Sequence, residues 1–382
     1  MLNYRTCIAS SLAEIGAPAW DALVRLQDDA NPFLSHAFLA ALHDTGCASA
    51  ATGWQPQYLC LWQGEELHAA LPLYAKSHSY GEYVFDWSWA DAYQRHGRRY
   101  YPKLLAAIPF TPVSGNRLLA RDAAARAALV DALCELQRSN DMSSTHVLFP
   151  TEVEAQTLQQ AGFMLRRGVQ FHWENAGYAD FDDFLATLER KKSKNIRAER
   201  RKVAEAGVRF RQVEGPQATA ADWAFFYRCY ANTYAEHHST PYLNLAFFER
   251  IGAAMPQHIL LIIAERDGEP IAASLLIHDR RALYGRYWGA LEQVPCLHFE
   301  TAYYQPLEFC IRRGIGSFEG GAQGEHKLAR GFLPRQTWSA HWLADPAFAD
   351  AVGHFLRRES SGMTTYVDEL REHAPYRNAN DR

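Results

Sequence analysis

A short aromatic motif occurs twice in this 382-residue chain, and the repeat constrains the fold more than any other feature of the sequence. Tyr-Gly-Glu-Tyr at 80–83 returns as Tyr-Gly-Arg-Tyr at 284–287, which is 204 positions later. The flanks keep this offset: the Gly-Glu pair at 64–65 aligns with the pair at 268–269, and the alternating apolar residues after each pair align as well. Self-similarity over such a distance indicates a tandem duplication.

The length of the chain agrees with a duplication. At roughly 150 residues per domain, 382 residues correspond to two or three domains. We predict two domains of similar topology, residues 1–172 and 173–382, and the second opens with a basic helix over 181–206. The content of 48% hydrophobic, 13% aromatic and 21% charged residues excludes a disordered or low-complexity chain.

The sequence patterns predict the same order of elements in both repeats: two helices, a hairpin, a third strand, a helix and a last strand. The hairpins are expected at 57–75 and 259–278, where two β-rich apolar runs flank a Gly-Glu turn. The fold class that follows is α/β (mixed α+β), with a central, mostly antiparallel sheet flanked by helices in each domain. The remaining elements are predicted as third strands at 80–87 and 283–290, helices near 100–107 and 297–313, and last strands at 109–113 and 316–320.

The charge and the cysteines narrow the class of protein. With 39 basic and 43 acidic side chains the net charge is −4, so the chain as a whole is not a polyanion-binding protein. The seven cysteines are scattered and form no C-x-x-C pair, which predicts reduced thiols rather than a disulfide framework or a zinc ribbon. The sequence has no signal-peptide pattern and no membrane-spanning apolar run. We therefore expect a soluble, cytoplasmic protein.

One local stretch is strongly basic. The predicted helix over 181–206 has eight basic and two acidic residues between Glu189 and Lys202. Such a helix repels itself unless an anionic partner binds it. The sequence predicts a phosphate-binding surface at Arg197, Arg200 and Arg201, and a solvated helix face is the alternative.

A second polar segment, residues 314–332, is rich in glycine. Glycine tolerates positive φ, so this backbone can approach a ligand closely. It has neither the Walker pattern nor the dinucleotide-binding glycine pattern, and nucleotide hydrolysis therefore has no support. A solvated turn is one alternative, and a metal site built from His298, Glu300, Glu325 and His326 is another. The polar side chains of the segment are Glu319, Gln323, Glu325, His326, Lys327 and Arg330.

Three runs carry a resemblance to a known family: HSYGEYVFDWSWADAY (78–93), LHFETAYYQPLEF (297–309) and FEGGAQGEHKLARGF (318–332). Over nearly the whole chain, the sequence resembles the FemAB-like family of N-acyltransferases, which is assigned to peptidoglycan biosynthesis or recognition within the GNAT superfamily. The resemblance implies two GNAT-like domains in tandem and the transfer of an acyl or aminoacyl group to an amine. Relatives take the aminoacyl group from charged tRNA and add it to a peptidoglycan precursor. Lys327 matches a lysine that such proteins carry.

The resemblance also suggests which donor is used. GNAT acetyltransferases follow the central strand with a Q/R-x-x-G-x-G/A loop that holds the CoA pyrophosphate, whereas residues 291–300 read LEQVPCLHFE. We therefore favour an aminoacyl-tRNA over acyl-CoA as the co-substrate. We expect no permanently bound cofactor and no metal. The expected partners are an amine-bearing acceptor, either a small molecule or a peptidoglycan precursor, and charged tRNA. The alternatives are a non-catalytic module that binds a cell-wall precursor or a peptide, an acyl-CoA-dependent enzyme acting on a small metabolite, and a metal-dependent enzyme.

Amide formation needs a neutral amine, donors for the tetrahedral oxyanion and a proton for the leaving group. We expect Glu325 or His326 as the base, Tyr303 or Tyr304 as the acid, and Lys327 beside them. The backbone amides of residues 285–289 are the expected oxyanion site, and the active site is expected in the second domain, which holds most of the titratable groups. The predicted substrate-binding residues are Arg286, Glu300, Glu319, Gln323 and Arg330, with Glu82, Asp86 and Tyr93 from the first domain.

Overall fold

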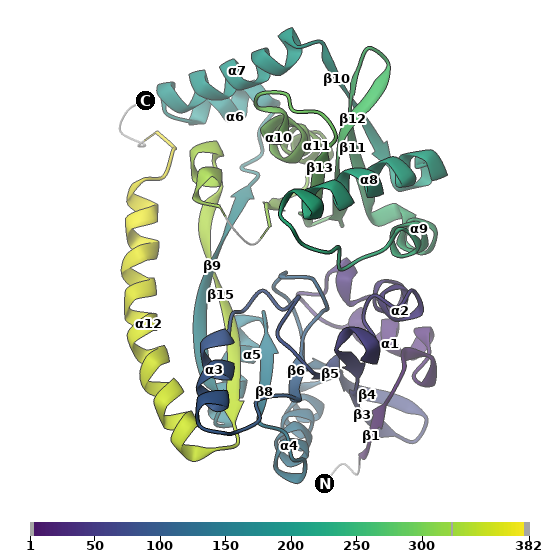
Figure 1. Cartoon of the computed structure of the whole chain (residues 1–382), viewed down its shortest axis with the longest axis vertical. Coiled ribbons are helices and arrows are strands. Elements are labelled where there is room, and N and C mark those ends of the chain that lie inside the picture. Colours follow the sequence, from purple (N-terminus) through teal and green to yellow (C-terminus); the bar gives the residue numbers. More distant parts are fainter. Residues whose placement is uncertain (1–3, 322–323, 378–382) are drawn as a thin grey trace. The chain divides into compact units, whose positions relative to one another are not determined.

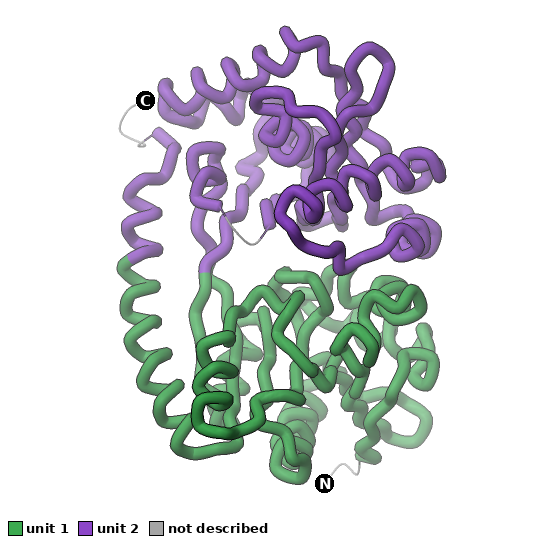
Figure 2. Tube along the Cα trace, viewed as in Figure 1, with its two compact units in different colours: residues 1–168, 336–365 green, residues 169–335, 366–382 purple. Residues whose placement is uncertain are grey.

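The computed structural model describes residues 4–321 and 324–377, and the chain forms two compact units (Figure 2). Unit 1 comprises residues 1–168 and 336–365, and unit 2 comprises residues 169–335 and 366–382. Residues 336–365, which the sequence division assigns to the second domain, therefore belong to unit 1.

Unit 1 has two sheets with helices packed on them (Figure 1). One sheet has the strand order β1-β3-β4-β7, and the other contains the order β15-β8-β6-β5-β2. The strands are β1 (Arg5–Ala9), β2 (Trp54–Pro56), β3 (Tyr58–Gln63), β4 (Glu66–Leu71), β5 (Leu73–Lys76), β6 (Lys103–Ala106), β7 (Leu119–Ala120) and β8 (Ser144–Leu148). The helices are α1 (Ala17–Val24), α2 (His36–Asp44), α3 (Trp87–Arg95), α4 (Ala123–Ser139) and α5 (Glu152–Gln160).

Unit 2 contains the strand order β10-β11-β12-β13-β14-β9. Its strands are β10 (Val208–Glu214), β11 (Ile259–Arg266), β12 (Glu269–His278), β13 (Ala282–Ala290) and β14 (Ser317–Glu319). Its helices are α6 (Phe181–Thr187), α7 (Arg190–Glu205), α8 (Ala220–Glu236), α9 (Leu245–Ala254), α10 (Leu297–Phe299) and α11 (Gln305–Arg313). Three elements carry residues of both units: β9 (Met164–Glu174), β15 (Leu333–Leu343) and α12 (Pro346–Glu372).

The long strand that follows each repeat, β9 after the first and β15 after the second, pairs in the other unit, which explains the assignment of residues 336–365. In unit 2, Glu174 at the end of β9 lies opposite Ser317 of β14, and in unit 1 Ser339 of β15 lies opposite Leu148 of β8. Val352 and Leu356 of α12 then join a core cluster of unit 1. The exchange is a tertiary pairing, and sequence periodicity contains no signal for it.

The two predicted hairpins are confirmed. They are β3–β4 in unit 1 and β11–β12 in unit 2, and each has a further antiparallel strand on its outer side, β1 on β3 and β10 on β11. In the second hairpin Asp267 and Gly268 both have positive φ, 53° and 84°. Positive φ at two successive residues is typical of the type I′ turn, whose twist matches that of the two strands of a hairpin.

The first repeat departs from the prediction after its hairpin. The strand predicted at 80–87 is absent: residues 80–86 form no strand, Trp87 begins α3, and Gly81 and Tyr83 have φ of 81° and 63°. The segment at 100–107 is not a helix: Lys103–Ala106 is the buried strand β6, because a short apolar run suits a strand as well as a helix. Residues 109–113 form no strand, since Pro109 and Pro112 have no N–H to donate to a ladder.

The second repeat follows the prediction closely. Its third strand is β13, its last strand is β14, and residues 297–313 are helical with a π-helical segment over Glu300–Tyr304. Gly314 ends this helix with φ of 63°. The basic segment, however, is two helices, α6 and α7. Leu188 between them is extended and bridges Tyr376, and the Glu189 amide donates to the Pro375 carbonyl at 2.8 Å.

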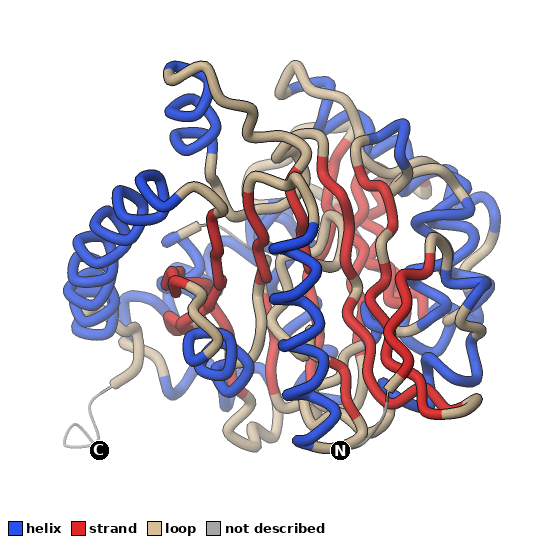
Figure 3. Tube along the Cα trace, turned by 90° about the horizontal axis from the view of Figure 1, so that it is seen from below, coloured by secondary structure: helices blue, strands red, loops and turns tan. Residues whose placement is uncertain are grey.

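Buried apolar side chains form the core of each unit. Figure 3 shows helices lying alongside the strands. In unit 2, α8 lies directly against β13 (Figure 1): a Cβ on Gly289 would lie 2.0 Å from the Cys229 carbonyl oxygen, so only glycine allows this approach. The Thr233 hydroxyl donates to the Trp288 carbonyl at 3.0 Å. The mixed α/β fold class is confirmed.

Candidate functional site

The candidate site lies in unit 2, where two neighbouring strands diverge. β13 and β14 pair in parallel only from Ala282 opposite Ser317 to Tyr284 opposite Glu319. β14 then ends and the chain turns through Gly320 and Gly321, while β13 continues to Ala290. A cavity of about 140 Å³ occupies the divergence. It is lined by Ser274, Leu275, Leu276, Gly285, Arg286, Tyr287, Trp288, His298, Ala302, Tyr303, Gly320 and Gly321.

A β-bulge lies among these lining residues. In the pairing of β12 with β13, Leu275 is opposite Tyr287 and Leu276 is opposite Gly285, so the register skips Arg286. Bulges interrupt a ladder and redirect a side chain, and they are frequent beside active sites. The predicted oxyanion site, the amides of residues 285–289, falls on this stretch and stays a prediction.

Lys327 lies behind the glycine turn of the cavity. It is on the 3₁₀ segment η7 (Glu325–Arg330), is 2% exposed, and donates from Nζ to the Gly321 carbonyl at 2.8 Å. A Cβ on Gly320 would lie 3.2 Å from the Lys327 Cδ, so the lysine stem packs on the backbone of the turn. Within residues 4–321 and 324–377 no carboxylate forms an ion pair with this lysine. Burial lowers the pKa of Lys327 to about 8.

His326 and Tyr303 form a pair at the same site. The His326 Nε2 lies 3.1 Å from the Tyr303 hydroxyl. Burial, with the charges of Arg330 and Lys327, lowers the pKa of His326, which favours a neutral imidazole. Burial raises the pKa of Tyr303 to about 12, so the phenol keeps its proton. The His298 ring is tilted against Trp288 with ring centres 4.8 Å apart, and burial lowers the pKa of His298 to about 4, so it is neutral too.

Tyr304 faces a different environment from its neighbour. Its side chain is fully buried, and its hydroxyl donates to Glu199 of α7 and accepts from the Arg330 Nε at 2.9 Å. Arg330 also forms an ion pair with Glu199 at 3.0 Å and donates to the His326 carbonyl at 2.8 Å. The predicted residues Tyr304 and Arg330 therefore belong to a network that fixes the backbone of His326, and neither lines the cavity.

Glu319 is the last residue of β14, directly before the glycine turn. Its carboxylate is 3.9 Å from the His172 Nε2 of β9, and its side chain is 15% exposed. Burial raises the pKa of Glu319 to about 8, against the opposing charge of Arg286. The arrangement supplies a carboxyl group that exchanges a proton near neutral pH at the edge of the cavity.

Two other predicted site residues of this unit, Glu325 and Glu300, do not line the cavity. The exposed Glu325 accepts a hydrogen bond from the Tyr366 hydroxyl of α12 at 2.5 Å. The buried Glu300 forms an ion pair with Arg200 at 3.0 Å and accepts from Gln305 at 2.8 Å. Gln323 falls outside the described residues.

The predicted phosphate-binding arginines are largely occupied within unit 2. Arg200 binds Glu300 and also Glu308, the latter at 2.6 Å; burial lowers its pKa, but these two carboxylates outweigh burial and raise it. Arg197 pairs with Asp182 at 2.8 Å. Arg201 is exposed and lies 3.6 Å from Glu205. Other basic residues of α7, among them Arg190, Lys191, Lys194 and Lys202, are exposed.

The predicted residues of the first domain are buried in unit 1. Lys103 of β6 is completely buried and pairs with Glu82 at 2.8 Å and with Asp86. Tyr93 of α3 is 3% exposed and stacks on Phe348, with ring centres 4.0 Å apart. Glu82 and Asp86 therefore hold a lysine, which gives these two carboxylates a structural partner in the fold.

Three residues that contact the predicted site residues were not predicted from the sequence: Glu199, Lys103 and His172. Glu199 is one of two acidic residues in a basic run, and its spacing from Val203 and Ile196, which are buried, would have placed it near the inner face of the helix. No sequence pattern pointed to Lys103 or His172. They approach Glu82 and Glu319 only in the folded chain.

Two further searches of the described part of the chain bear on the alternatives. Within residues 4–321 and 324–377, no group of three or more His, Cys, Asp or Glu side chains could hold a metal ion. Among the helices of that same part, none is long and apolar enough to cross a bilayer.

Comparisons with known proteins identify a family and proteins of similar fold. A family model described as FemAB-like, peptidoglycan biosynthesis/recognition, matches residues 11–378. The solved structure of FemX has a TM-score of 0.56 and 11% identity, and covers 89% of this chain and 98% of its own. The C-terminal domain of a putative lysylphosphatidylglycerol synthetase from Agrobacterium fabrum has a TM-score of 0.55 and 13% identity, covering 91% and 97% of the two chains. L-PGS from Bacillus licheniformis has a TM-score of 0.52 and 9% identity, covering 89% and 97%.

Identities this low establish a shared fold alone, and no curated protein sequence matches the chain. The family model, in contrast, spans almost the entire sequence. It confirms the resemblance that the repeated motifs and the glycine-rich segment indicated. The chain belongs to the FemAB-like family.

Proposed function

We propose that the protein is an N-acyltransferase that forms an amide bond, and that the cavity between β13 and β14 is its active site. One observation carries the proposal: a buried lysine, Lys327, is fixed against the glycine turn of this cavity and has a pKa of about 8. Perturbed titratable groups beside a cavity mark functional sites more often than structural ones. Family membership and the fold shared with FemX support the same reaction class.

The side chains around the cavity suit amide formation. The nitrogen of the acceptor amine attacks the donor carbonyl, a C–N bond forms, and the C–O or C–S bond to the carrier breaks. The amine proton passes to a base, and His326, which is neutral and 3.1 Å from Tyr303, suits that role. Tyr303 returns a proton to the leaving oxygen or sulfur. The Lys327 ammonium stabilises the developing oxyanion or an anionic group of a substrate.

An aminoacyl-tRNA is our proposed donor, with acyl-CoA as the alternative. The exposed basic side chains on α7 offer contacts to phosphates, although Arg197 and Arg200 are used within the unit. One protein with a similar fold is described as a putative lysylphosphatidylglycerol synthetase. The proposed acceptor is an amine, either on a peptidoglycan precursor or on a small molecule. A cytoplasmic location fits because all seven cysteines are free thiols.

The test is an amide-forming assay with charged tRNA and acyl-CoA offered separately to amine acceptors, with products identified by mass spectrometry. We expect Lys327→Met to lower turnover by about 100-fold, since removal of one transition-state group costs that much. The variant Lys327→Arg keeps the charge and separates electrostatic from proton-transfer roles. The assay is paired with thermal unfolding, to show that both variants are folded. Wild-type turnover in Lys327→Met would contradict the proposal.

A further inference from the structure

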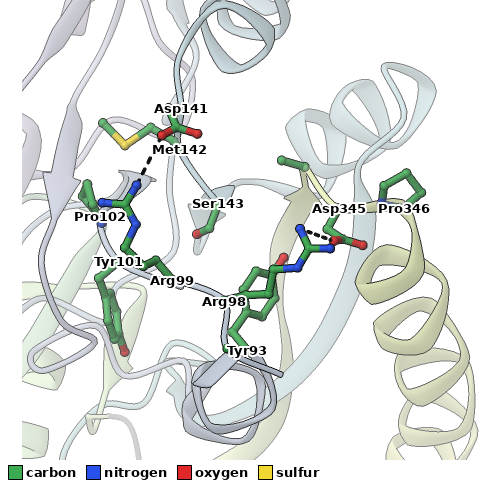
Figure 4. Close-up of a pocket in the computed structure, with 12 residues that line it drawn as sticks. Tyr93, Arg98, Arg99, Tyr101, Pro102, Asp141, Met142, Ser143, Asp345 and Pro346 are labelled. Atoms are coloured by element: carbon green, nitrogen blue, oxygen red, sulfur yellow. Dashed lines mark hydrogen bonds and ion pairs between the residues drawn. The ribbon is translucent and has the colours of Figure 1, made fainter. Parts of the chain in front are cut away.

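A second and larger cavity lies in unit 1, and nothing in the proposed reaction uses it. Its volume is about 710 Å³, within the range of roughly 300–1,000 Å³ that small-molecule sites occupy. The loop after α3, the residues before β8 and the residues after β15 line it (Figure 4).

The charged side chains of this cavity form two complementary pairs. Arg98 lies 3.3 Å from Asp345, and Arg99 lies 3.4 Å from Asp141. Figure 4 shows the two pairs on opposite sides of the cavity, with Ser143 between them. The Arg99 and Asp141 side chains are 84% and 98% exposed, and that of Arg98 is 63% exposed. Ion pairs this exposed contribute little to stability, so a ligand can replace them at small cost.

Tyr93 lines the cavity and is held in place by aromatic contacts. Its ring packs against Phe348 and Tyr100, with ring centres 4.0 and 5.1 Å away. Its hydroxyl oxygen is buried and does not reach a ligand in the cavity. The ring therefore supplies a fixed wall, and the charged groups select the ligand.

The charge pattern selects among ligands. A purely anionic ligand would meet the carboxylates of Asp141 and Asp345, and a purely cationic one would meet the guanidinium groups of Arg98 and Arg99. A molecule with one positive and one negative end is complementary to both sides.

We propose that this cavity binds a short peptide with free termini, with its carboxylate on Arg99 and its ammonium group on Asp345 of the opposite side. The inference is independent of the proposed acyl transfer, because all the residues that carry it belong to unit 1 and none lines the cavity of unit 2.

The experiment measures binding of trialanine to the full chain by saturation-transfer NMR and titration calorimetry. We expect millimolar binding, weakened about 2- to 5-fold in Arg99→Gln and in Asp345→Asn, since ion pairs of exposed side chains contribute little. Asparagine at 345 keeps the acceptor that binds the amide of Ala347 at 2.9 Å. Tyr93→Phe should bind trialanine like the wild type, because its buried hydroxyl does not reach the ligand.

Two controls make the outcome decisive. Arg121→Gln removes an arginine that pairs with Glu66 in the same unit at 2.8 Å but does not line the cavity, and it should bind trialanine like the wild type. N-acetylated trialanine amide, which has no charged terminus, should not bind. Absence of trialanine binding by the wild type, or equal binding of the blocked peptide, would overturn the proposal.

Discussion

Lys103 in unit 1 and Lys327 in unit 2 are both buried, and comparing them shows how the same side chain acquires opposite properties. Lys103 is 0% exposed and Lys327 is 2% exposed. Burial alone lowers the pKa of both. At Lys103 the carboxylates of Glu82 and Asp86 outweigh burial and raise the pKa above its ordinary value. Lys327 has a backbone carbonyl as its acceptor, and its pKa falls to about 8.

The difference teaches that burial does not by itself mark a functional lysine. A buried ammonium with carboxylate partners is a fixed cation, because its charge is compensated within the fold. A buried ammonium with only a neutral acceptor remains responsive to pH and to an incoming anion. By this criterion Lys103 is a structural cation. Lys76 of unit 1, whose pKa burial lowers to about 7, meets the same criterion as Lys327, so the cavity beside the glycine turn is the second observation that favours unit 2 for the proposed reactive site.

The largest expected effect comes from Lys103→Met. It leaves Glu82 and Asp86 buried without their cation, and breaking such a pair costs about 3–5 kcal/mol of unfolding free energy. Denaturant titration at neutral pH measures the loss. The matched control is Lys76→Met, since Lys76 is also 0% exposed but lies 3.9 Å over the Trp54 ring with no carboxylate in ion-pair contact in the described residues. Equal losses in both variants would remove the distinction drawn here.

A smaller effect is expected from Glu82→Gln, about 1 kcal/mol at neutral pH, because the pair of Lys103 with Asp86 remains. Burial raises the pKa of Glu82 to about 7, above its value in the unfolded chain. The unfolding free energy that this group contributes therefore decreases as the pH rises from about 4.5 to 7. Asp86 acts oppositely: although burial alone would raise its pKa, Lys103 lowers it, so its contribution is lost as the pH falls below its ordinary value. When the unfolding free energy is measured against pH, the variant should therefore lack the decrease between about pH 4.5 and 7 and keep the acid-side loss that is due to Asp86. An unchanged profile would contradict the assignment.

The smallest effect on stability is expected from Lys327→Met. The wild-type ammonium is buried without a carboxylate, so at neutral pH the apolar variant should unfold at the same denaturant concentration or a higher one. The folded pKa of Lys327 is about 8 and that of the unfolded chain is near 10.5, so wild-type stability gains from this group as the pH rises between them. The advantage of the variant should shrink over that interval. A clear loss of stability at neutral pH would make Lys327 a structural cation like Lys103.

Much of unit 2 was predictable from local sequence. The hairpin, the aromatic strand β13, the helix ending at Gly314 and the short strand β14 all follow from periodicity and turn residues. In unit 1 the hairpin was predictable, but β6 and the irregular segment around Tyr83 were not. A buried apolar run of four residues has no distinguishing period, so its environment decides its conformation.

The candidate site was predictable only in part. The concentration of polar residues on a glycine-rich segment singled out Lys327 and His326, and the structure sets one against the cavity turn and the other beside Tyr303. The same composition also singled out Glu325 and Glu300, which face Tyr366 and Arg200 instead. Sequence spacing cannot separate these cases, because residues one position apart on a tight turn point in different directions.

By itself the sequence determined the duplication, the family and the chemical inventory of the glycine-rich segment, since these depend on which residues occur and at what spacing. The tertiary structure decided which strands pair across the repeats, where β13 leaves β14, and which charged groups neutralise each other. These properties depend on contacts between residues far apart in the chain, such as Arg200 with Glu300 and Lys103 with Glu82. Electrostatic energies depend on distance and burial, and only the folded chain fixes either one.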